Sequence, residues 1–276
     1  LFSRNDKPAF NQKDERFLKL KVALPFLSSK RLELGFGIAQ IEDRYFQNNV
    51  IDFDKDKYDK SGYRLFGGSV SFNGSTLNSR QFPIQGAREA LVAQIFTGNE
   101  SFRPGVNSEN KKPVKEKHSW LQLSYMKEKY HKMGANWILG WYLDAVYASK
   151  NFSENYTATM MQASEFAPTA HSKLTYNEAF RANQYVAAGI RPIYRLNQMF
   201  HVRGEFYGFL PIFPIERNSI NKAYYGKAFS RFEYLGEISV VCQLPFGAIS
   251  AYVNHYSSPR REWNVGLTLG WQLFNY

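Results

Sequence analysis

The sequence predicts an all-β protein: a transmembrane antiparallel β-barrel with about 12 readable strands, up to roughly 16, short periplasmic turns and long extracellular loops. Three observations carry this prediction. Apolar and polar residues alternate along most of the chain, aromatic residues make up 17% of it, and long polar segments alternate with short ones. No run of about 18 apolar residues could form a membrane-spanning helix. Barrel strands need no such run, because only every second residue faces lipid.

The alternation is clearest in the last stretch, residues 262–276. Its apolar row contains Trp263, Val265, Leu267, Leu269, Trp271 and Leu273. The residues between them are mostly small and polar, so the period of two predicts a strand with two unlike faces. A bulky row with a Trp near each end is typical of lipid-facing girdles. The set Asn264, Gly266, Leu269 and Trp271 also matches a C-terminal outer-membrane signal of the form polar, x, Gly, x, x, apolar, x, aromatic.

Ten earlier strands repeat the pattern. In chain order they contain residues 18–24, 32–38, 66–72, 91–95, 121–125, 137–147, 186–190, 200–210, 232–244 and 249–253. Trp137 and Trp141 place further girdle residues on the clearest copy of the last strand. Single-chain bacterial barrels usually have an even number of strands. Either one more strand is therefore hidden, or the chain begins in mid-barrel.

The segments between these strands differ in length. Long polar segments are expected at residues 48–62, 97–117 and 150–181, and short turns at 25–30, 196–198 and 245–247. This difference is the one expected between extracellular loops and periplasmic turns.

The rows opposite the apolar rows carry charge. They contain Lys19, Lys21, Arg31, Glu33, Arg64, Asp144, Arg191, Arg203, Glu205, Glu233 and Glu237. A small soluble barrel fills its interior with apolar side chains, whereas a closed barrel in lipid can line a wet lumen with ion pairs. The sequence therefore predicts lumen charges at Arg31, Glu33, Arg203, Glu205, Glu233 and Glu237. A soluble β-sandwich with a polar outer face is the alternative.

The net charge of +11 would suggest nucleic acid in a soluble protein. The basic residues are dispersed, however, and no nucleic-acid partner is expected. The one dense cluster comprises Lys111, Lys112, Lys115 and Lys117. A solvated loop is its plain interpretation, and contact with anionic lipid headgroups or lipopolysaccharide is the functional alternative. Cys242, the single cysteine, lies on an apolar row and is interpreted as an inert thiol.

Candidate catalytic residues are sparse. The sequence has no Gly-x-Ser-x-Gly elbow. His255 and Ser257 lie two residues apart on a strand, which resembles the His-x-Ser dyad of outer-membrane lipid A deacylases. An interfacial His and a turn Ser is the alternative interpretation, because no acidic residue that could orient the His is evident nearby. We predict no catalytic site, no cofactor and no metal, and leave open whether the protein is an enzyme.

Residues 166–173 and 180–189 carry the most specific pattern in the chain. FAPTAHSK and FRANQYVAAG resemble the C-terminal region of patatin-like phospholipases of Bacteroidota. The stretch 76–82 with Gly86, the FRPG turn at 102–105 and the ending at 271–275 are similar to the same family.

The resemblance implies a patatin domain with a Ser/Asp dyad, a linking domain, and a barrel of the barrel-assembly and two-partner-secretion superfamily. This sequence has neither the serine elbow nor the Asp-Gly of the dyad, so no catalytic residue carries over. Residues 1–276 would be the outer-membrane barrel domain alone, without the upstream patatin and linking domains.

The leading hypothesis is an outer-membrane barrel of a Gram-negative bacterium, by resemblance one of the Bacteroidota. It would anchor or translocate a patatin-like lipid acyl hydrolase and be non-catalytic itself. A membrane-embedded lipid hydrolase or deacylase using His255 and Ser257 is one alternative, and a barrel subunit of a larger export or assembly complex is another. The expected partners are outer-membrane lipid and lipopolysaccharide, together with a homodimer or a larger envelope complex.

Overall fold

A computed structural model describes residues 11–27, 29–47, 58–106, 108–258 and 263–271. Eleven of the described strands form one sheet. They are β1 (Asn11–Leu27), β2 (Lys30–Tyr45), β3 (Asp59–Ser75), β4 (Gly86–Arg103), β5 (Val114–Lys132), β6 (Trp137–Ala148), β9 (Gln184–Arg195), β10 (Phe200–Pro211), β13 (Glu233–Leu244), β14 (Gly247–Tyr256) and β15 (Trp263–Trp271). Each contains one of the rows that the sequence predicts.

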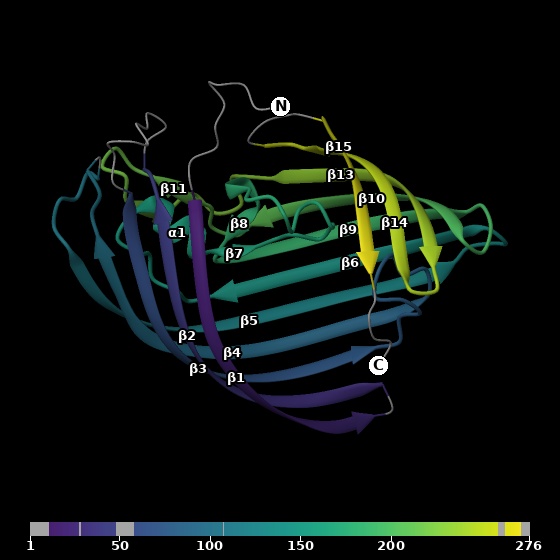
Figure 1. Cartoon of the computed structure of the whole chain (residues 1–276), viewed down its shortest axis with the longest axis horizontal. Helices are drawn as coiled ribbons and strands as arrows, with labels where there is room; N and C mark the ends of the chain where they lie inside the picture. The colour runs from purple at the N-terminus through teal and green to yellow at the C-terminus, as the bar shows by residue number, and fades with distance from the viewer. Residues whose placement is uncertain (1–10, 28, 48–57, 107, 259–262, 272–276) are drawn as a thin grey trace.

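The strands follow one another in chain order, and every neighbouring pair is antiparallel. Two insertions leave the sheet. The first lies between β6 and β9 and holds α1 (Tyr156–Gln162), β7 (Ser164–Glu165), η1 (Glu178–Phe180) and β8 (Arg181–Ala182). The second lies between β10 and β13 and holds β11 (Ile215–Arg217) and β12 (Ala223–Tyr225). Figure 1 shows the large sheet curling around the first insertion.

The outer face of the sheet is apolar and open to its surroundings. Leu18, Ile38 and Phe66 lie side by side across β1, β2 and β3, and all three are exposed. On β15, Val265 and Leu267 are each 80% exposed. A soluble sandwich would bury such a face against a second sheet, and here it remains uncovered. The all-β, transmembrane barrel fold class is therefore confirmed. None of the helices among the described residues is long and apolar enough to cross a membrane.

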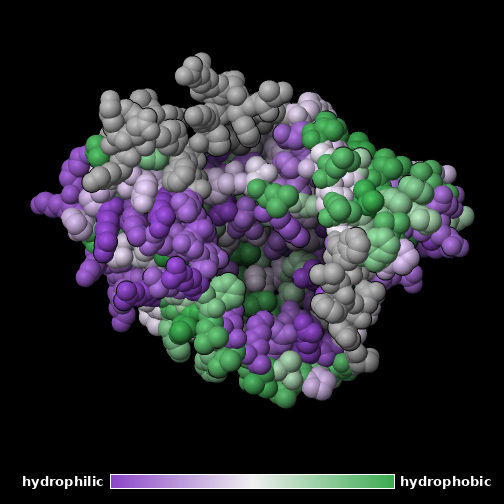
Figure 2. Space-filling model, in the orientation of Figure 1, coloured by the Kyte–Doolittle hydropathy of each residue, from purple (hydrophilic) through white to green (hydrophobic). Residues whose placement is uncertain are grey.

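The two edges of the sheet are not paired with each other. Within the described ranges, β1 pairs only with β2, and β15 pairs only with β14. Figure 1 shows the gap between these two strands, and Figure 2 shows the interior through it. The expectation of a closed wall is thus not met by these eleven strands.

The loops sort to opposite ends, with several corrections to the predicted lengths. β4 continues to Arg103 and β5 begins at Val114, so the connection predicted at 97–117 is much shorter. The strands extend past the apolar band because a sheet can continue into water with polar residues on both faces. β3 begins at Asp59, and residues 48–57 of the predicted loop lie outside the described residues. Residues 76–85, between β3 and β4 at the short-turn end, form a connection that the sequence analysis did not predict.

Candidate functional site

The first insertion fills the lumen from the long-loop end. Phe166 stacks on Phe209 of β10 with ring centroids 5.7 Å apart, and it also meets Tyr185 and Tyr207 edge-on. Phe180 contacts the same Phe209 ring. These rings belong to one buried cluster that joins the insertion to the inner faces of β6, β9, β10 and β13. We call residues 149–183 the upper plug.

Polar contacts tie the upper plug to the opposite wall. The Asn155 side chain accepts a hydrogen bond from the backbone N–H of Ala158 at 2.9 Å and so caps α1. Its Nδ2 donates to the hydroxyl of Tyr45 on β2 at 2.7 Å. Ser153 bonds the Tyr63 hydroxyl on β3 at 2.8 Å. The plug therefore spans the lumen, with its aromatic side on β9 and β10 and its polar side on β2 and β3.

A buried amine lies at this rim. Lys150 lies two residues after the end of β6, and its Nζ lies 4.7 Å from the ring centroid of Trp120 and 5.6 Å from that of Tyr63. Burial disfavours the charged amine and lowers the pKa of Lys150 to about 8. The carboxylate of Glu100 opposes this shift, which shows that desolvation dominates.

An ionic layer lies beneath the upper plug, in the middle of the lumen. Arg191 of β9 pairs with Glu128 of β5 and donates to the Tyr207 hydroxyl at 2.6 Å. Arg203 of β10 pairs with Glu205, and its Nη2 donates to the Tyr130 hydroxyl at 2.9 Å. Two guanidinium groups thus face two carboxylates. The opposite charges of this layer balance, and each buried ion depends on its partners.

Two glycines make room for this layer. A side chain at Gly140 would place its Cβ 2.6 Å from the Tyr130 ring and 3.1 Å from the Arg191 side chain. At Gly189 it would lie 2.2 Å from the Tyr207 ring. The aromatic rings therefore lie flat over glycine backbone, and this close approach brings both hydroxyls to the arginines.

The connection between β3 and β4, residues 76–85, enters the lumen from the short-turn end, and we call it the lower plug. Arg203 donates to the Pro83 carbonyl at 2.9 Å. Leu77 and Ile84 pack against the buried cluster of Tyr130, Ile138 and Ile193. The side chain of Asn78 accepts from the N–H groups of Ile84 and Gln85, each at 3.0 Å, which holds the loop in shape. The ionic layer is therefore covered from both ends of the lumen.

The predicted lumen charges lie on the inner face but in unlike surroundings. Arg203 and Glu205 are buried in the ionic layer. Arg31 and Glu33 pair on β2, where the Arg31 side chain is 64% exposed. The remaining two, Glu233 and Glu237 on β13, are buried and bond to Ser257 and Asn254. Arg64, which the sequence placed in the same rows, lies on the outer face beside Phe66, because the apolar row continues into polar residues on that face.

The predicted girdle residues lie on the outer face. Trp137 is 56% exposed at the short-turn end, with its ring centroid 5.0 Å from that of Tyr194. Trp141 lies four residues further along β6 on the same face, and it is half-buried. Trp263 is 70% exposed at the long-loop end. Trp271 ends β15 opposite Gly247, and its side chain lies outside the described part.

The remaining signal residues lie on β15. Asn264 and Gly266 occupy its inner face, where Asn264 donates to Asn254 at 3.2 Å. Leu269 is exposed on the outer face. No contact of these residues tests the sorting role itself.

The structure does not bring the His255–Ser257 pair together. The His255 ring lies on the outer face between Trp263, at a centroid distance of 5.0 Å, and Tyr234, at 6.1 Å. The Ser257 hydroxyl instead bonds Glu233 and accepts from the backbone N–H of Tyr234 at 2.9 Å. Among the described residues, His255 and Ser257 form no hydrogen bond with each other.

One group of described residues has atoms placed for metal coordination. Glu100, Glu116 and His118 offer ligand atoms within 4.8 Å of one another. Glu100 already bonds His118 at 2.8 Å and accepts from Tyr63 at 3.1 Å. These contacts satisfy the buried carboxylate without an ion.

Sequence reasoning missed Glu128 and both plugs. Glu128 could have been found by continuing the alternation of the fifth strand, because it shares a face with Tyr130 in the same register. Phe166 and Phe180 had no such signal, since they stand alone in an aperiodic segment.

Comparisons with known proteins give the following similarities. No family model matches the sequence, and no curated protein matches it. Among solved structures, the chain is similar to the transport unit of the autotransporter AIDA-I from Escherichia coli, with 12% identity, a TM-score of 0.44, and coverage of 96% of this chain and 84% of that one. It is also similar to BauA, the ferric preacinetobactin receptor from Acinetobacter baumannii, with 8% identity and a TM-score of 0.46. That match covers 94% of this chain, which spans 40% of the receptor's length.

Proposed function

We propose that this chain is an outer-membrane β-barrel that serves as a membrane anchor with a closed lumen, and that it is not itself catalytic. The observation that carries this proposal is the contrast between an uncovered apolar outer face and an inner face that the two plugs cover over β6, β9 and β10. An apolar face of this extent is stabilised by hydrocarbon and not by water. Over these strands the plugs obstruct a solute or an extended polypeptide unless one of them moves.

The resemblance to patatin-like phospholipases supports a hydrolase as the anchored passenger. The lumen favours anchoring over translocation, because Phe166 and Phe180 would have to leave the aromatic cluster before a chain could pass. Intact mass of the native polypeptide from the cell envelope tests the passenger. A covalently attached hydrolase-sized domain is expected, and a polypeptide of barrel mass alone overturns this part of the proposal.

Conductance across a planar bilayer tests the closed lumen. The refolded protein is expected to give few opening events. The double variant Phe166→Ala, Phe180→Ala is expected to open frequently, because it removes both rings that hold the upper plug. Leu174→Ala is the matched control, since Leu174 lies in the same segment and is 86% exposed. Steady conductance of the unchanged protein would overturn the closed lumen.

A second function, as the subunit of a larger envelope assembly, is favoured by the two edges that remain unpaired among the described strands. Lipid-exposed sheet edges do not occur within the hydrocarbon region, because their backbone groups would lack partners. Strands β1 and β15 therefore require pairing in a bilayer. A disulfide between Leu20→Cys in one chain and Leu267→Cys in another would support pairing between copies, and its absence in cross-linked membranes would reject a second copy as the partner. The dyad enzyme has no such support, because His255 and Ser257 contact different partners.

A further inference from the structure

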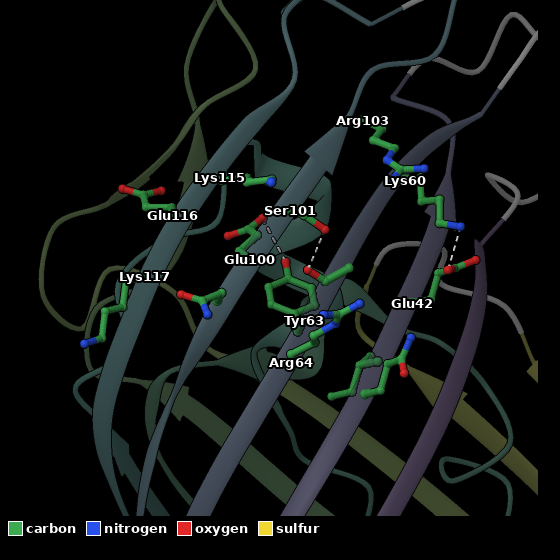
Figure 3. A pocket seen from close by; sticks show the side chains of 14 residues that line it. Glu42, Lys60, Tyr63, Arg64, Glu100, Ser101, Arg103, Lys115, Glu116 and Lys117 are labelled. Atoms are coloured by element: carbon green, nitrogen blue, oxygen red, sulfur yellow. Dashed lines mark hydrogen bonds and ion pairs between the residues drawn. The ribbon is translucent and has the colours of Figure 1, made fainter.

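A groove on the outer face of β2, β3, β4 and β5 gathers several cations near the long-loop end. It has a volume of about 660 Å³ (Figure 3). Five of its lining side chains are cationic: Lys60, Arg64, Arg103, Lys115 and Lys117. Gly62 lies among them and leaves a depression that longer side chains surround. Figure 3 shows Lys60 and Arg103 toward one end of the groove, and Arg64 and Lys117 further along the strands.

The carboxylates in this region neutralise few of these cations. Glu42 pairs with Lys60 at 2.6 Å and with Arg44 at 2.6 Å. Glu100 is buried on the inner face and bonds Tyr63 and His118. Within the described part of the chain, the other four groove cations, Arg64, Arg103, Lys115 and Lys117, form no ion pair. An unpaired cation array is costly to maintain, and an anionic ligand would relieve the repulsion between its members.

The groove lies next to the apolar part of the outer face, on the side of the long loops. On β3, Arg64 is followed two residues later on the same face by Phe66, and about 6.6 Å separates such positions along a strand. On β5, Lys117 is followed on the same face by Ser119 and the exposed Leu121. Figure 2 shows the hydrophilic side chains gathering toward the long-loop end, on the left, and apolar ones over β14 and β15 at the right.

A second, more open groove continues the first toward this apolar part. It has a volume of about 780 Å³, and it shares Arg64, Lys117, Gln40 and Asn99 with the first groove. Its other outward lining includes the apolar Leu18, Ile38 and Phe66. A cationic cleft thus opens into an apolar one along the same surface, which is the shape of a phosphorylated headgroup joined to acyl chains.

We infer that this double groove binds a phosphorylated, multiply acylated glycolipid of the outer leaflet, of the lipid A class. Arg64 and Arg103 would hold phosphate oxygens through paired N–H donors, and the lysines would add point charges. Acyl chains would lie along Leu18, Ile38 and Phe66. The inference rests on the proposed membrane location, with the long loops outside the cell. A soluble polyanion would use the cations but would leave the apolar groove empty.

Binding to lipid A in mixed detergent micelles tests the inference. The full chain is refolded, and folding is first checked by the mobility difference between heated and unheated samples. Bis-phosphorylated lipid A is then titrated and followed by tryptophan fluorescence, with its dephosphorylated form and inorganic pyrophosphate as comparison probes. The phosphorylated lipid is expected to bind at least about tenfold more tightly than either comparison probe, because each lacks one of the two recognised parts.

Variants locate the site. Arg64→Gln with Lys117→Gln is expected to weaken binding at least about tenfold, since both residues line the shared part of the two grooves. Lys129→Gln with Lys132→Gln is the matched control, because these exposed lysines carry the same charge near the other end of β5. It is expected to bind within about twofold of the unchanged protein.

The outcomes separate the inference from the proposed function. An equal loss of lipid A binding in both double variants overturns the inference, and so does equal binding of the dephosphorylated lipid. In either case a correctly folded barrel leaves the proposed function standing. Pyrophosphate binding as tight as that of the lipid assigns the groove to a soluble anion and also overturns it. A chain that stays folded and monodisperse in plain buffer defeats the proposed function itself.

Discussion

The inner face of the sheet holds the same kind of charge pair in two very different settings. On β10, Arg203 is 2% exposed and pairs with Glu205 beneath two plugs. On β2, Arg31 pairs with Glu33 beside the open edge, with its side chain 64% exposed. Position on the lumen face therefore says little about what a pair contributes. Coverage by the plugs decides how much a pair contributes to stability. Water screens an exposed pair and weakens it. A buried charge is shielded from water and depends on its partner.

The largest expected effect is at the covered pair. Arg203→Ala leaves the Glu205 carboxylate buried beside a single remaining arginine, and the unfolding free energy is expected to fall by about 3–5 kcal/mol. Urea unfolding of the protein refolded into lipid vesicles measures it. A loss no greater than that of Arg31→Ala would remove the distinction between the two regions.

The next effect is a pH dependence at the covered rim. Lys150 loses its proton near pH 8 in the folded protein, against 10.5 in an unfolded chain. Between these values the unfolded chain binds more protons, so the unfolding free energy rises with pH across this window, by about 3 kcal/mol in total. Below pH 8 the contribution is constant. Lys150→Met should remove the rise, and an unchanged pH profile in that variant would assign it to other groups.

A smaller effect is expected where the upper plug meets β2. Asn155→Ala removes the cap of α1 and the bond to Tyr45, and it is expected to cost about 1–2 kcal/mol. Asn155→Asp retains the capping oxygen and loses only the donor to Tyr45. Protection of the α1 amides from hydrogen exchange reports both changes, and equal protection in Asn155→Ala and the unchanged protein would contradict the role of the cap.

The smallest effect is expected at the open pair. Arg31→Ala should change the unfolding free energy by less than about 1 kcal/mol, because solvent screens the pair and Lys21 still reaches Glu33 at 3.1 Å. The same urea experiment measures it. A change of several kcal/mol would indicate that this part of the lumen is covered by something beyond the described residues.

The sequence predicted the wall of this molecule far better than its contents. Period two identifies a strand wherever one face is apolar, which is why β6 and β15 were recognised from residues such as Trp137 and Leu267. The ends of β4 and β5 were missed because both faces become polar beyond the apolar band, as at Arg103 and Lys115. Arg64 was assigned to the wrong face for the same reason.

The contents of the lumen depend on contacts between residues far apart in the chain. Arg203 meets Pro83 across 120 positions, and Asn155 meets Tyr45 across 110. Neither residue has a neighbour in sequence that marks its partner. The glycines show the same limit: Gly140 was visible as a small residue in a strand, but only the fold shows that Tyr130 lies over it.

The direct ladder between β6 and β9 has a consequence for assembly. Tyr147 lies opposite Gln184, so the wall closes immediately where the upper plug leaves and re-enters it. The plug is therefore a side branch whose docking breaks no strand pairing. The wall has low contact order, because most of its strands pair with the next strand in the chain. Successive hairpins can therefore form before the upper plug docks in the lumen. We therefore expect folding of the wall and docking of the upper plug to be separable events.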